Sequence, residues 1–158
     1  MVQVEPNRTA IGIELRCAEK WRDYPYMDVV AKELLNLGFN VYVFDLEYGL
    51  RINGINNIVG QSLRTVMQYI ANMDLMICPD SGLMHIAGAL DVPMLAIVAP
   101  TDFATRLQSY NNVVGVDFDC KDYPCWYNPC KGQNSYQPCL SQIKPKIIVN
   151  KVREVVQI

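Results

Sequence analysis

The stretch Asp80-Ser81-Gly82-Leu83-Met84-His85-Ile86-Ala87-Gly88-Ala89-Leu90 decides the fold, together with the apolar runs at 75–78 and 94–98 that flank it. Short uninterrupted apolar runs are typical of strands that are buried on both faces of a parallel sheet. The polar turn between them leads at once into a short helix. The free backbone N–H groups at the start of that helix, around Ser81 and Gly82, attract anions, and phosphate above all. The sequence therefore predicts a site for a phosphorylated ligand.

The same alternation of strand and helix continues on both sides of this stretch. Further strands are predicted at 9–15, 41–44 and 113–116, with a brief one within 52–59, and further helices at 25–37, 62–72 and 145–158. This order predicts an α/β fold, a Rossmann-like and mostly parallel sheet with helices on both faces. Ligands of such sheets bind outside the carboxyl ends of the strands. We therefore expect the site to be lined by the loops 16–24, 45–49, 79–82 and 99–106.

Composition limits the class of protein. The chain has 158 residues, of which 51% are hydrophobic and 19% charged, with a net charge of -2. We expect one domain over residues 1–158, with an irregular Cys-rich excursion at 119–140 and a C-terminal helix at 145–158. The absence of a basic cluster argues against nucleic acid as a partner.

No apolar run approaches the length of a membrane span, and residues 1–9 lack the apolar core of a signal peptide. We therefore expect a cytoplasmic location, with peripheral association at the inner membrane face as an open alternative.

Four of the six cysteines crowd into one segment, at Cys120, Cys125, Cys130 and Cys139. They are separated by four, four and eight residues, whereas tetrahedral thiolate sites favour closer pairs. Three alternatives stay open for these side chains: a structural zinc or iron ion, free thiols, or a disulfide.

Further motifs accompany the central stretch. Glu19-Lys20-Trp21 precedes Pro25, Ala99-Pro100-Thr101 follows the strand at 94–98, and Pro124-Cys125 and Cys139-Leu140 lie in the Cys-rich segment. Together with 80–90, these motifs resemble those in the carboxy-terminal half of the glycosyltransferase family 9 enzymes, the heptosyltransferases of lipopolysaccharide assembly. The resemblance implies one half of a GT-B fold, the half that binds a nucleoside-diphosphate sugar such as ADP-heptose.

The same resemblance implies an activity and its requirements. The reaction would transfer a heptose-like sugar to a saccharide or lipid-linked saccharide acceptor with inversion, and it would need no cofactor. The family's amino-terminal half binds the acceptor and supplies the base, and nothing in this chain resembles it. We therefore name no catalytic residue and expect the chain to be inactive alone, completed by an N-terminal domain or a partner chain.

The resemblance also implies roles for single residues. Ser81, Gly82 and His85 would hold the diphosphate with Lys20 as the cation, while Arg16 and Arg22 are weaker alternatives to Lys20. Asp80 would face the sugar, Thr101 would line the same cleft, and Glu47 would bind the ribose, unless the acid falls at Asp45 instead. Each has a plain structural alternative, such as a helix-capping serine, a core histidine or a solvated lysine.

Two rival functions stay open. The pocket could serve a non-catalytic module that binds nucleotide sugars, or the cysteines could organise a metal-containing interaction domain. Binding of nucleoside diphosphates and metal analysis separate these alternatives.

Overall fold

The structure is a computed structural model that describes residues 7–99, 101–116, 118–126, 130 and 138–157. A six-stranded sheet runs through it, and every pair of neighbouring strands is parallel. The strands, in the spatial order β3-β2-β1-β4-β5-β6, are β3 (Asn56–Val59), β2 (Asn40–Asp45), β1 (Ala10–Glu14), β4 (Leu75–Pro79), β5 (Met94–Ile97) and β6 (Val113–Gly115). The predicted parallel α/β sheet is confirmed.

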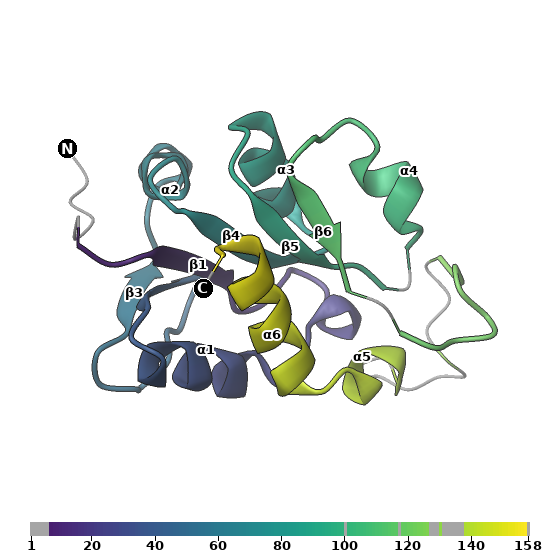
Figure 1. Ribbon diagram of the computed structural model, residues 1–158. Coiled ribbons are helices and arrows are strands. Elements are labelled where there is room, and N and C mark those ends of the chain that lie inside the picture. Colours follow the sequence, from purple (N-terminus) through teal and green to yellow (C-terminus); the bar gives the residue numbers. More distant parts are fainter. Residues whose placement is uncertain (1–6, 100, 117, 127–129, 131–137, 158) are drawn as a thin grey trace.

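Helices cover both faces of the sheet (Figure 1). One face carries α1 (Met27–Asn36) and α6 (Pro145–Val155), and the other carries α2 (Leu63–Ile70) and α3 (Gly82–Ala89). Three short helices complete the described part: η1 (Lys20–Arg22), α4 (Phe103–Leu107) and α5 (Pro138–Gln142). Within the described residues, no helix is long and apolar enough to cross a membrane.

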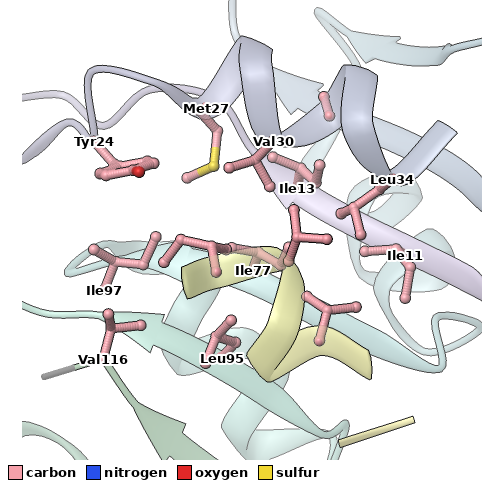
Figure 2. Packing of buried hydrophobic residues seen from close by; sticks show 14 of the residues in the cluster. Ile11, Ile13, Tyr24, Met27, Val30, Leu34, Ile77, Leu95, Ile97 and Val116 are labelled. Atoms are coloured by element: carbon pink, nitrogen blue, oxygen red, sulfur yellow. The ribbon is translucent and has the colours of Figure 1, made fainter. Parts of the chain in front are cut away.

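Two apolar cores result, one on each side of the sheet. Ile11 and Ile13 of β1 point to the first core, where Val30 and Leu34 of α1 pack against them (Figure 2). Phe44, Met76 and Met84 belong to the second core, under α2 and α3. The central strands are buried on both faces, which explains their continuous apolar runs.

Two local features depart from a simple pattern of buried helices and irregular loops. Leu63 and Met67 of α2 are 62% and 40% exposed although both are apolar. Leu63 lies in the first turn of α2 and lines the cavity described below rather than the core. The helix α4 falls at the end of a predicted loop, where the side chain of Asp102 caps it by accepting from the Thr105 amide at 2.7 Å.

The strand order fixes where a ligand can bind. From β1 the chain proceeds to β2 and β3 on one side, and from β4 it proceeds to β5 and β6 on the other. A crevice opens at such a switch point, beyond the carboxyl ends of the two central strands. Glu14 ends β1 there, and Asp80 follows the last residue of β4.

Candidate functional site

A cavity of about 420 Å³ opens at this switch point. All four predicted loops contribute to its wall. Its polar lining includes Glu14, Arg16, Arg22, Asp80, Ser81 and Arg106. Its apolar lining includes Phe44, Leu46, Ile58, Leu63, Val66 and Leu83. The site therefore joins an apolar wall to a charged one.

A second cavity, of about 480 Å³, lies at the opposite edge of the sheet beside Asn7, Arg8, Asp74 and Pro93. Although it is slightly larger, it adjoins the amino ends of the strands, where parallel sheets do not bind ligands. We therefore place the candidate site in the cavity at the carboxyl ends.

The start of α3 forms one wall of the site. Ser81 is its N-cap: its hydroxyl oxygen accepts from the Met84 amide at 3.4 Å and donates to Oε2 of Glu14. Gly82, the first helical residue, is exposed, and apart from its two neighbours in the chain and the backbone of its own helix no atom lies within 4 Å of the place where a Cβ would stand. The leading end of the helix is thus not covered by packed side chains at Gly82, as an anion site requires.

Asp80 lies at the centre of an ionic cluster and is only 2% exposed. Its Oδ2 accepts from the Thr101 hydroxyl at 2.6 Å and lies 3.7 Å from Nη1 of Arg22 and 3.6 Å from Nε of Arg106. Arg22 also donates to the backbone oxygen of Asp80 at 2.9 Å. Asp80 therefore ties two cavity-lining guanidinium groups together, and its predicted contact with a sugar stays a prediction.

A second ion pair lies at the edge of β2. Arg16 donates to both carboxylate oxygens of Asp45, at 2.7 and 2.8 Å, and both residues line the cavity. Burial is the largest single effect and opposes ionisation of Asp45, but the hydrogen bonds and charge of Arg16 together with the backbone amides of Glu47 and Tyr48 outweigh it and hold the pKa of this carboxyl below its usual value. Glu47 is exposed and is not among the cavity-lining residues, so the acid on this edge that does line the cavity is Asp45.

The other predicted residues fall in different places. His85 lines the cavity, and its Nδ1 lies 2.9 Å from the Tyr110 hydroxyl. Thr101 is fully buried behind Asp80. Lys20, in η1, is exposed and is not among the cavity-lining residues, whereas Arg22 of the same turn is.

Two charged residues of the site were not named individually from the sequence. Arg106 lies in α4, at the end of the predicted loop 99–106, where no periodic signal singles it out. Glu14 carries a stronger signal, because a carboxylate at the end of an otherwise apolar buried strand requires an explanation. Burial raises its pKa from 4.5 to about 8, although the hydrogen bond from Ser81 acts in the opposite direction.

The described residues of the cysteine segment present no recognisable metal site. Within the described ranges, no group of three or more His, Cys, Asp or Glu side chains could hold a metal ion. Burial raises the pKa of Cys139 to about 11, and the thiols of Cys120, Cys130 and Cys125 add to the rise. Residues 127–129 and 131–137 of this segment lie outside the described residues.

Comparison with known proteins adds independent information. The chain is 33% identical over 119 residues to lipopolysaccharide heptosyltransferase 2 of Salmonella typhimurium, covering 65% of this chain and 34% of that protein. It is 28% identical over 127 residues to lipooligosaccharide heptosyltransferase 2 of Campylobacter jejuni, covering 78% and 37%. The chain therefore spans about a third of the length of these curated relatives.

Solved structures share the fold. The ADP-heptose lipopolysaccharide heptosyltransferase II of E. coli superposes with a TM-score of 0.77 at 19% identity, covering 98% of this chain and 48% of that one. The iron-containing heptosyltransferase TibC of enterotoxigenic E. coli, in complex with ADP-D-β-D-heptose, gives a TM-score of 0.73 at 16% identity, covering 99% and 46%. Both are of the GT-B type.

The family model of glycosyltransferase family 9 (heptosyltransferase) matches residues 20–135, which is most of the chain. That range includes the start of α3, the two arginines around Asp80 and the apolar wall of the cavity. Four lining residues precede it: Glu14, Arg16, Cys17 and Ala18. The chain belongs to glycosyltransferase family 9, the heptosyltransferase family.

Proposed function

We propose that this chain binds a nucleoside-diphosphate sugar, of the ADP-heptose type, as the donor half of an inverting glycosyltransferase. The observation that carries the proposal is the cavity at the switch point, where three arginines and the open start of α3 meet. Relatives crystallised with ADP or ADP-heptose support the choice of ligand.

The charges of the cavity suit a diphosphate. Its lining holds three arginines, Arg16, Arg22 and Arg106, against the carboxylates of Asp45 and Asp80, so one positive charge is left over while Glu14 is neutral. A planar guanidinium group offers paired N–H donors that match phosphate oxygens. We assign the diphosphate to Arg22, Arg106 and the backbone at Gly82, with Lys20 as an outer cation.

The apolar wall suits the rest of the nucleotide. Phe44, Ile58 and Leu63 offer a surface for a planar base, as ligand cavities commonly do. On the same side, Asp45 or Glu47 would take the ribose hydroxyls. His85 lies on the opposite, diphosphate side of this arrangement, on α3.

The proposed chemistry is electrostatic. As the glycosidic bond to the diphosphate breaks, negative charge grows on the departing nucleoside diphosphate, and fixed arginines lower the energy of that state. The cations on the cavity wall belong to the protein, so we propose that transfer needs no metal ion in the cleft. The saccharide acceptor and the base that takes its proton belong to another part of the enzyme, which we propose acts at the cytoplasmic side of the membrane.

Isothermal titration calorimetry of the chain with ADP, UDP and GDP tests the proposal. We expect saturable binding of ADP, and Arg106→Gln should weaken it by about 1.5 to 3 kcal/mol, roughly 10- to 150-fold in Kd. Lys146→Gln, at an exposed position of α6 that does not line the cavity, is the matched control, and we expect a much smaller effect. Absence of binding by all three nucleotides contradicts the proposal.

A metal ion on Cys120, Cys125, Cys130 and Cys139 stays a separate prediction. One relative is described as iron-containing, but the described residues of this chain present no ligand group, and we derive no role for a metal from them. Elemental analysis of the purified chain tests it: a stoichiometric zinc or iron ion would support the prediction, and its absence would contradict it.

A further inference from the structure

Glu14 is a buried acid whose role the proposed function leaves unexplained. It is 5% exposed, it ends the central strand β1, and it lies at the wall of the cavity. Its Oε2 accepts the hydroxyl hydrogen of Ser81, the residue that caps α3. The acid therefore lies directly behind the helix start that would hold the diphosphate.

The surroundings of Glu14 favour its neutral form. None of the ion pairs between described residues includes it, and a carboxylate buried without a cation in contact is costly. The charged groups that act on Glu14 are Asp23, Arg22 and Asp45, and Glu14 in turn adds to the raised pKa of the Cys17 and Cys78 thiols. Burial has the largest effect and favours the neutral form, as do Asp23 and Asp45, whereas the hydrogen bond from Ser81 and the charge of Arg22 favour the ionised form. Burial also raises the pKa of both thiols far above the usual value of a thiol.

We propose that Glu14 is a positioning residue of the diphosphate site: as a neutral carboxyl it fixes the Ser81 hydroxyl at the start of α3 and keeps a negative charge away from the bound anion. This inference rests on the proposed function. Ionisation of Glu14 places a carboxylate behind the site, where it repels the diphosphate. Removal of the side chain frees the Ser81 hydroxyl from its partner.

The pH dependence of ADP binding tests this role. Titrations at several pH values from 7 to 9.5 keep the terminal phosphate of ADP ionised throughout. Because the pKa of Glu14 is raised to about 8, the affinity of the unaltered chain should fall above that pH, by up to about tenfold per pH unit. Glu14→Ala should weaken binding at pH 7. Glu14→Gln, which preserves an acceptor for Ser81 and cannot ionise, should recover part of that loss and show no fall above pH 8.

A second measurement separates positioning from mere structural support. Between pH 4.5 and 8 the unfolded chain releases the Glu14 proton and the folded chain keeps it, so the stability of the unaltered chain should fall with rising pH relative to Glu14→Gln. If this stability difference appears while the ADP profiles of the two proteins run parallel, Glu14 is structural only and the inference is overturned.

The outcomes also distinguish this inference from the proposed function. ADP binding with identical pH profiles for the unaltered chain and Glu14→Gln overturns the role of Glu14 alone. Absence of ADP binding by the unaltered chain at pH 7 overturns both. A fall above pH 8 that Glu14→Gln abolishes supports both.

Discussion

Replacement of Asp80 by alanine is the perturbation that best exposes how the site is built. The Asp80 side chain is 3% exposed and contacts Thr101, Arg22 and Arg106. The side chains of Arg22 and Arg106 are 17% and 27% exposed. Removal of one partner from a buried ion pair costs about 3 to 5 kcal/mol, because the remaining charge is left uncompensated. Since water can reach part of both arginines, we expect a loss at the lower end, about 3 kcal/mol in the free energy of unfolding.

Equilibrium denaturation by urea measures this loss directly. A chain of this size should also melt roughly 6 to 12 °C lower, at 2 to 4 °C per kcal/mol. Glu154→Ala, at an exposed position of α6, is the matched control and should change stability by no more than about 0.5 kcal/mol. ADP affinity should fall as well, because the two arginines lose their anchor. If Asp80→Ala lowered the stability by less than about 1 kcal/mol and weakened only the binding of the sugar part, Asp80 would be a sugar ligand and this reasoning would be refuted.

Three further predictions follow from local geometry. A Cβ on Gly88 would lie 2.5 Å from Cδ1 of Tyr110. Gly88→Ala should therefore destabilise the fold by about 1 to 3 kcal/mol and displace the Tyr110 hydroxyl from Nδ1 of His85. An unchanged ¹⁵N spectrum of the His85 imidazole would contradict this prediction. Ser62 caps α2 by accepting from the Thr65 amide, and Ser62→Ala should cost about 1 kcal/mol in urea denaturation, whereas Ser62→Asp should cost less. Excess EDTA should leave the Kd for ADP unchanged, since the proposed cations of the cavity are arginines; loss of binding on chelation would show that a metal ion takes part.

The elements with strong local signals could be predicted from the sequence. The start of α3 is one example, since a buried strand, a polar turn and a helix follow one another within 16 residues from Leu75 to Leu90. Ser62 as the cap of α2 is another. The parallel order of the sheet follows from the alternation of strands and helices, and it also placed all four site loops at one edge.

The electrostatic partners could not be predicted, because they come from distant parts of the chain. Asp80 meets Arg22, which is 58 residues away in sequence, and Arg106, which lies in a five-residue helix. Arg22 lines the cavity and Lys20 does not, because both lie in a single 3-10 turn within the loop 16–24 that directs them differently. An irregular loop has no hydrophobic periodicity from which this orientation could be predicted. Glu14 is buried because β1 lies in the middle of the sheet, between β2 and β4. The alternation of apolar and polar residues within β1 does not show which strands lie beside it.

The most direct test of the central claim follows backbone amide signals of the ¹⁵N-labelled chain during titration with ADP. If the start of α3 and the arginines beside it bind the diphosphate, the amides of Gly82 and Leu83 and the side-chain signals of Arg22 and Arg106 should shift together and saturate. If the shifts were instead confined to Asn7, Arg8 and Asp74, at the cavity on the opposite edge of the sheet, the account would be contradicted.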